Sequence, residues 1–367
     1  PHAVVERGEK GSAVLLSFLP KFEPAARAAE VIFVVDRSGS MGGDSIAEVR
    51  NALQLCLRSL TPGSRFNIVS FGSTYAPLFD GSRMYDEASL GEAAAFVRTL
   101  DADMGGTEIL PALQYVVQQP LVAGLPRQVL VMTDGEVTNT DEVIALARRH
   151  AAAARFFTFG IGAGASHHLV KGLARASRGA AEFISPGERV EAKVMRQFTR
   201  VFTPAMTCVD VAWGQEGLTP ASDRVPPVFD GERVRVYALG GATVASGTAT
   251  LRGTIAGRDV AFDIAIDPAS AVEGDTIATL AARERIRMLE EEGEYLESRG
   301  SLQRRSRATG KAAAEIAALG VQYQLASRET SFVAVEHRDA PLEGRAELRR
   351  VPVALASGWG GLRETGT

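Results

Sequence analysis

The apolar positions in the first half of the chain alternate between two spacings. Residues 31–35 (VIFVV) form a continuous apolar run, which is typical of a strand buried on both faces. Apolar residues then recur at three- and four-residue steps from Ile46 to Leu60, which predicts an amphipathic helix ending before Pro62. Further strands are expected at 66–71, 128–133, 155–161 and 180–184, with helices near 87–99, 108–119, 140–152, 166–177 and 188–203. This order predicts an α/β fold with a doubly wound, mainly parallel sheet.

The pattern changes near Thr203, where apolar and polar residues begin to alternate between turn residues. This alternation predicts antiparallel strands at 206–213, 232–239, 243–255 and 259–266, within a β region of residues 204–272. Residues 273–326 are charged and helical in pattern. Residues 327–340 return to a strand pattern, and residues 341–367 have the composition of a tail or linker.

One apolar segment, AVLLSFL at 13–19, has no place in the α/β order. It precedes the first sheet strand across a polar, helix-prone linker, so its side chains need another sheet to pack against. We therefore expect residues 11–20 to be the first strand of the β region. Residues 28–203 are then inserted in an antiparallel β-sandwich that carries a C-terminal helical segment.

The composition narrows the classes of partner. Of the 367 residues 46% are hydrophobic, enough to bury a sizeable core. The 40 basic and 44 acidic residues leave a net charge of -4, which gives no electrostatic case for nucleic acid. No run approaches the roughly 20 apolar residues that span a bilayer. Cys56 and Cys208 make neither a disulfide framework nor a zinc site, and both are expected in the core. Compartment and oligomeric state stay open.

Oxygen-bearing side chains gather where strands of the first half end. Strand 31–35 leads into Asp36, Ser38 and Ser40. Strand 128–133 ends at Asp134, and Thr107 lies in a Gly-Gly-Thr-Glu turn that opens a helix. Loops at the carboxyl ends of strands in open α/β sheets meet in one crevice, so we expect these side chains to converge.

The three motifs DRSGSM, GGTEI and TDGE resemble the metal-ion-dependent adhesion site of the von Willebrand factor type A domain. The resemblance covers roughly residues 28–203. The wider layout resembles the VIT-VWA group, which includes von Willebrand A domain 5A proteins and inter-alpha-trypsin inhibitor heavy chains. The resemblance implies a partner protein that presents Asp or Glu to the metal. It also implies that the preceding VIT domain is missing and the chain is a piece of a longer protein. The metal ligands that it implies are Asp36, Ser38, Ser40, Thr107 and Asp134.

The expected ligand set favours a hard cation. Hydroxyl and carboxylate oxygens without His or Cys suit Mg²⁺ first, with Mn²⁺ or Ca²⁺ as alternatives. Three of the five ligands are neutral hydroxyls, so the ion stays electron-poor and can accept a partner's carboxylate. In the alternative interpretation there is no metal: Ser38 and Ser40 cap the following helix and Asp134 caps its own turn.

Two classes of function compete for this site. A binding module needs the metal and specific loops, whereas a metal-dependent hydrolase or phosphotransferase needs a base or nucleophile beside the ion. The three motifs hold no His, Cys or Lys, and the chain has no P-loop and no Gly-x-Ser-x-Gly elbow. A non-enzymatic, protein-binding module is therefore favoured. An adhesion-like role and a scaffold role beside an AAA+ ATPase are not separated.

Other polar residues near the motifs have simpler interpretations. The adjacent His167 and His168 face different directions in regular structure, which favours a surface helix start over a metal site. Glu108 and Glu136 are expected as solvated charges. Arg37 either steers an acidic ligand or is simply exposed.

Overall fold

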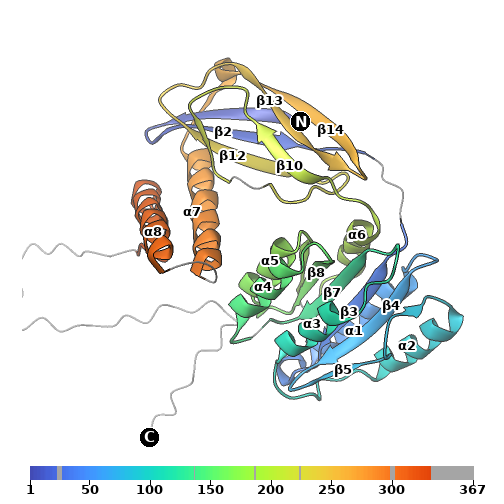
Figure 1. Ribbon diagram of the computed structural model, residues 1–367. Coiled ribbons are helices and arrows are strands. Elements are labelled where there is room, and N and C mark those ends of the chain that lie inside the picture. Colours follow the sequence, from blue (N-terminus) through green and yellow to red (C-terminus); the bar gives the residue numbers. More distant parts are fainter. Residues whose placement is uncertain (23–26, 136, 186, 223–224, 298–301, 332–367) are drawn as a thin grey trace, which may run out of the picture.

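The computed structural model describes residues 1–22, 27–135, 137–185, 187–222, 225–297 and 302–331. These residues form an α/β region and a β region with two long helices (Figure 1). Among them, no helix is both long enough and apolar enough to cross a membrane.

The α/β region is built on a seven-stranded sheet in the order β5-β4-β3-β7-β8-β9, with β6 also paired to β4. Five neighbouring strands, β4, β3, β7, β8 and β9, run parallel to one another. The short strands β5 and β6 run antiparallel to β4. The strands are β3 (Glu30–Asp36), β4 (Arg65–Phe71), β5 (Tyr75–Pro77), β6 (Arg83–Met84), β7 (Arg127–Thr133), β8 (Ala154–Ile161) and β9 (Ala181–Ile184). The predicted strands and the predicted parallel order are confirmed.

Helices cover both faces of this sheet, so the side chains of β3, β7 and most of β4 are buried on both sides. One face packs against α1 (Asp44–Arg58), α2 (Glu87–Thr99) and α6 (Glu191–Phe202). The other face packs against α3 (Ile109–Gln118), α4 (Thr140–Arg149) and α5 (His167–Ala176). A single 3₁₀ turn, Gly39–Met41, lies between β3 and α1.

The β region consists of two sheets that enclose one apolar core. The larger sheet, in the order β11-β12-β2-β1-β15, contains β1 (His2–Gly8), β2 (Gly11–Phe18), β11 (Leu218–Pro220), β12 (Val234–Gly240) and β15 (Val272–Glu273). The smaller sheet contains β10 (Thr207–Ala212), β13 (Gly247–Ile255) and β14 (Arg258–Ile266). Strand β2 pairs with β12, more than 200 residues away. The apolar segment upstream of the α/β region therefore lies in the β region, while the exact domain boundaries stay a prediction.

Two features of the β region differ from the sequence prediction. Strands β1, β11 and β15 were not expected, and β15 pairs with β1 in parallel, so the larger sheet is not wholly antiparallel. Cys208 is exposed, although it was expected in the core. Val209 and Val211 pack against the core, so the alternation of β10 places Cys208 on the outer side, where its φ is 51° within a shift of register between Thr207 and Asp210.

Helices α7 (Thr276–Glu297) and α8 (Leu302–Tyr323) follow the β region (Figure 1). Ile277 and Tyr323 pack with Ala13 on the outer face of the larger sheet. The described part of the predicted return strand, residues 327–331, forms only a bridge between Ser327 and Thr330. Residues 332–340 of that strand and the predicted tail lie outside the described residues.

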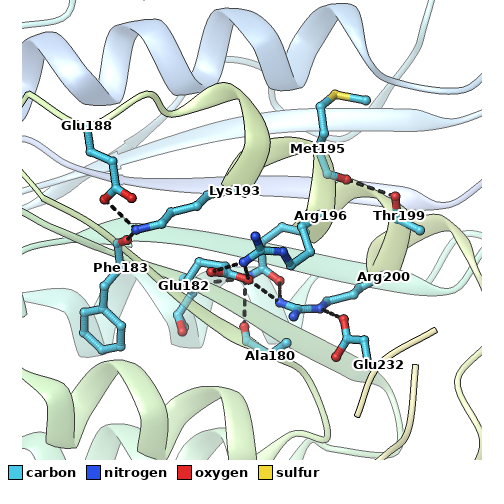
Figure 2. Close-up of polar contacts among 12 residues, drawn as sticks. Ala180, Glu182, Phe183, Glu188, Lys193, Met195, Arg196, Thr199, Arg200 and Glu232 are labelled. Atoms are coloured by element: carbon cyan, nitrogen blue, oxygen red, sulfur yellow. Dashed lines mark hydrogen bonds and ion pairs between the residues drawn. The ribbon is translucent and has the colours of Figure 1, made fainter. Parts of the chain in front are cut away.

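A loop of the β region, residues 229–232, joins the two regions. The Phe229 side chain belongs to the core under α6, with its ring 6.2 Å from that of Phe157. Arg200 of α6 forms ion pairs with Glu182 of β9 and with Glu232 of this loop (Figure 2). The loop is thus held to the α/β region by an aromatic contact with β8 and by an ion pair with α6.

Candidate functional site

Three loops are joined by backbone hydrogen bonds at the carboxyl end of β3. The Arg37 N–H donates to the carbonyl of Phe71 over 2.8 Å, which joins the loops after β3 and β4. The Gly39 N–H donates to the carbonyl of Gly105 over 2.8 Å, and the Met104 N–H donates to the carbonyl of Arg37 over 3.0 Å. The loop that carries Thr107 is therefore fixed against the Asp36-Ser38-Ser40 turn, as the motif order predicts.

Gly72 and Ser73, which follow β4, hold the Thr107 loop in place. This role was not predicted from the sequence. A Cβ at Gly72 would lie 2.3 Å from the Cβ of Met104, so the close approach of the two loops requires glycine. The Ser73 hydroxyl accepts a hydrogen bond from the Gly106 N–H over 2.8 Å. A lone Gly-Ser after a strand carries no signal that distinguishes it from an ordinary turn.

Asp36 is fully buried and accepts hydrogen bonds at both carboxylate oxygens. The Ser38 N–H donates to Oδ1 over 2.9 Å, and the Thr133 hydroxyl donates to Oδ2 over 2.5 Å. Burial raises the pKa of Asp36 to about 6 and outweighs the hydrogen bonds from Ser38 and Thr133, which lower it; the nearby Asp134 carboxylate raises it further. Thr133 was not predicted, although it directly precedes Asp134 at the strand end.

The two serine hydroxyls are not used as helix caps. The Ser38 Oγ and Ser40 Oγ atoms lie 3.0 Å apart. Ser38 precedes the 3₁₀ turn without a side-chain capping bond, and the residue before α1 is Gly43. The capping interpretation therefore does not describe these side chains.

Asp134 has a buried carboxylate oxygen, Oδ1, that no described residue satisfies with a hydrogen bond. Its backbone carbonyl accepts the Ser166 N–H over 2.8 Å, which fixes the loop and leaves the side chain uncommitted. Thr107 is half-buried, and the Glu108 N–H donates to the carbonyl of Gly72 over 2.8 Å. The contacts thus bring Asp36, Ser38, Ser40 and Asp134 together, and they fix the Thr107 loop beside them.

The donor chemistry at this place fits a hard cation. Among the described residues, no group of three or more His, Cys, Asp or Glu side chains is arranged to hold a metal ion. An ion at the end of β3 must therefore combine two carboxylates with hydroxyl oxygens and water. This combination suits Mg²⁺, which retains waters readily.

The neighbouring polar residues have mostly structural roles. The Arg37 side chain is only 14% exposed and pairs with Asp103 over 2.5 Å, so it braces the loop instead of being free for a ligand. His167 begins α5, as predicted, and stacks on Phe183. His168 lies 3.4 Å from Asp141. Glu136 lies outside the described residues.

The comparisons with known proteins agree with this fold. Residues 29–183 match the family model of the von Willebrand factor type A domain, and this part of the chain is such a domain. Human von Willebrand factor A domain-containing protein 5B1 is 40% identical over 238 residues, which are 62% of this chain and 19% of that protein. Human von Willebrand factor A domain-containing protein 5A is 39% identical over 232 residues, which are 60% of this chain and 30% of that protein.

A von Willebrand factor A domain-containing protein of Dictyostelium discoideum is 32% identical over 350 residues, which are 91% of this chain and 37% of that protein. This similarity extends well beyond the matched domain into the β region. The chain spans between about a fifth and two fifths of these relatives.

Proposed function

We propose that the chain is a protein-binding module that holds a divalent cation, Mg²⁺ first, at the end of β3. Asp36, Ser38, Ser40, Thr107 and Asp134 supply the protein oxygens. An ion held by these residues would supply Lewis acidity, to which an Asp or Glu carboxylate of the partner would bind. No catalytic step is assigned to the module.

The observation that carries this proposal is the buried, unsatisfied Oδ1 of Asp134 beside the buried Asp36. A buried carboxylate oxygen without a hydrogen-bond partner is unfavourable by roughly 1–3 kcal/mol or more. The two buried carboxylates of Asp36 and Asp134 also repel each other, and a cation between them would relieve this repulsion. The Ser38 and Ser40 hydroxyls, which hydrogen-bond to each other and cap no helix, would supply further oxygens.

A hydrolase or phosphotransferase would need a general base or nucleophile next to the ion. His167 and His168, at the start of α5, are already engaged: His167 stacks on Phe183, and His168 lies beside Asp141. The family match also favours a non-enzymatic role, because type A domains are generally interaction modules.

Calorimetric titration of the EDTA-treated protein with Mg²⁺ and with Mn²⁺ tests the metal. We expect one site per chain in the wild-type protein and none in Asp36→Ala. The absence of binding of either ion by the wild-type protein would contradict the proposal.

Affinity capture in Mg²⁺ and in EDTA tests the partner. Proteins captured by the wild-type chain in Mg²⁺ should be lost in EDTA and with Asp134→Ala. Asp86→Ala is a control, since Asp86 caps α2 and lies outside the site loops. Capture that is unchanged by EDTA would contradict a metal-dependent interaction.

A further inference from the structure

An aromatic pair lies beside the proposed metal site at the edge of the sheet. Asp36 pairs with Phe71, and Phe71 pairs with Tyr75, so the three residues form one row across β3, β4 and β5. Neighbouring strands are ~4.8 Å apart, which places the Tyr75 backbone about 10 Å from that of Asp36. The Tyr75 ring lies 5.1 Å from the ring of Tyr115 on α3, at an angle of 34°. Tyr75 is 36% exposed.

Two acidic residues, Asp80 and Glu108, lie in the segments next to the aromatic pair. The Tyr115 hydroxyl donates to the backbone carbonyl of Asp80 over 3.5 Å. Burial raises the pKa of Tyr115, and Tyr75 and the Asp80 carboxylate raise it further, so the Asp80 charge acts on this ring. Glu108 lies directly before α3, seven residues before Tyr115, at the end of the helix next to the Thr107 loop.

The charge of these two carboxylates is not compensated within the described residues. Asp80 and Glu108 are exposed, and neither side chain has an ion pair with a described residue. Arg83, the arginine nearest to Asp80 in the sequence, pairs with Glu92, and Arg37, which is hydrogen-bonded to the loop before Glu108, pairs with Asp103. An aromatic pair with one exposed ring, close to carboxylates that have no ion pair, is complementary to a cationic side chain.

We propose that Tyr75, Tyr115, Asp80 and Glu108 bind an arginine side chain of the partner. A guanidinium group stacks flat on an aromatic ring and donates hydrogen bonds to carboxylates at its edge, whereas the compact, strongly hydrated lysine ammonium does so less well. The distance of about 10 Å between the Asp36 and Tyr75 backbones sets the spacing of the two binding residues in the partner, because it corresponds to about three residues of extended chain. The arginine therefore lies about three residues from the acidic residue that binds the metal. This spacing rests on the proposed function, while the arginine site itself does not.

The arginine site can be tested without the metal. The probe is N-acetylarginine N-methylamide, and its neutral citrulline analogue is the control. Titrated in EDTA, the arginine probe should shift the nuclear magnetic resonance signals of the Tyr75 and Tyr115 rings, and the citrulline analogue should not. Tyr75→Leu should abolish the shifts at Tyr115, whereas Tyr75→Phe, which keeps the aromatic face, should retain them. Equal shifts with both probes, or none with either, would overturn the proposal.

Peptides test the link to the metal site. In Mg²⁺, a peptide with Arg three residues from Asp should bind about two- to fivefold more tightly than the same peptide with Gln in place of Arg. Tyr75→Leu should weaken only the Arg peptide, and Met84→Ala, an exposed change on β6, should weaken neither. Equal weakening of both peptides by Tyr75→Leu, or tighter binding of a peptide with Leu in place of Arg, would overturn the inference. If Mg²⁺ enhances binding of neither peptide, the metal-dependent function fails, and the probe titration alone then decides the arginine site.

Discussion

Strand β3 carries a buried carboxylate at each end, and the two ends differ in what compensates the charge. At the amino end, Glu30 accepts hydrogen bonds from Arg127 at 2.8 and 3.3 Å and from the Ser82 hydroxyl at 2.7 Å. At the carboxyl end, Asp36 accepts hydrogen bonds only from neutral donors. The second carboxylate there, Asp134, leaves one buried oxygen unpaired.

Burial is therefore not what distinguishes the two ends. Glu30 is 2% exposed and Asp36 is 0% exposed, so both charges lie away from water. The amino end contains its own cation, and the Arg127 guanidinium is further fixed by the carbonyls of Val116, Gln119 and Pro120. The carboxyl end contains no cationic side chain paired to Asp36 or Asp134 among the described residues. The amino end is therefore complete for folding, whereas the carboxyl end keeps an unpaired carboxylate oxygen, which supports the proposed cation site.

The largest expected effect is at the amino end. Arg127→Ala leaves Glu30 buried and uncompensated, which should lower the free energy of unfolding by about 3–5 kcal/mol. Urea denaturation measures this change. Arg83→Ala is the control, because its pair with Glu92 is about half exposed and should contribute less than about 1 kcal/mol. Equal effects of the two substitutions would show that the Glu30 pair is not a special feature of the fold.

Excision tests whether the difference between the ends is local to the α/β region. A fragment of residues 28–203 retains both ends of β3 and should still bind Mg²⁺. It lacks Phe229, whose ring belongs to the core beneath α6, so we expect it to be less stable than the full chain by about 3 kcal/mol. Thermal unfolding of the fragment and of Phe229→Ala in the full chain should show similar losses. A fragment as stable as the full chain would contradict this role of Phe229.

Removing the carboxylate charge should have opposite effects at the two ends. Without metal, Asp36→Asn removes a buried, uncompensated charge and should raise the free energy of unfolding by about 1–2 kcal/mol. Glu30→Gln deprives Arg127 of its partner and should lower it. Chemical denaturation of both variants in EDTA provides the measurement. A loss of stability in both would mean that Asp36 is compensated by the protein itself.

The smallest effect on folding is expected from Ser38→Ala combined with Ser40→Ala. Neither hydroxyl caps a helix, so the far-ultraviolet circular dichroism spectrum should be unchanged and the stability in EDTA should change by less than about 1 kcal/mol. Mg²⁺ binding should nevertheless be lost. A collapsed spectrum would instead assign the serines a structural role.

Hydrophobic spacing was sufficient to predict most of the α/β region. Runs such as 31–35 and 128–133 are buried on both faces and flanked by helices of clear period, so local pattern and tertiary burial agree. The convergence of the loops that carry Asp36, Ser38, Ser40 and Asp134 was predictable because strand ends in a parallel sheet face one crevice. The metal-ligand role of these residues is implied by the family resemblance and stays a prediction. The supporting roles of Gly72 and Ser73 were not predictable, because they depend on the close approach of the Met104 loop, more than 30 residues away in the sequence.

The β region was less predictable because its pairings are long-range. Strand β1 is held by β2 and by β15, and its buried Glu6 accepts hydrogen bonds from the N–H groups at the start of α7, Thr276 and Ala278. A charged residue in a short strand gives no local sign of that partnership. Phe229 likewise reads as part of a loop in the β region, yet its ring completes the core of the other region.

The most direct test of the central claim is anomalous diffraction from crystals grown with Mn²⁺. We predict one anomalous peak per chain at the carboxyl end of β3, among the oxygens of Asp36, Ser38, Ser40, Thr107 and Asp134. No peak should appear at the amino end, where Arg127 already compensates Glu30. The absence of a peak at the Asp36 end, with Mn²⁺ in the crystal, would contradict the account.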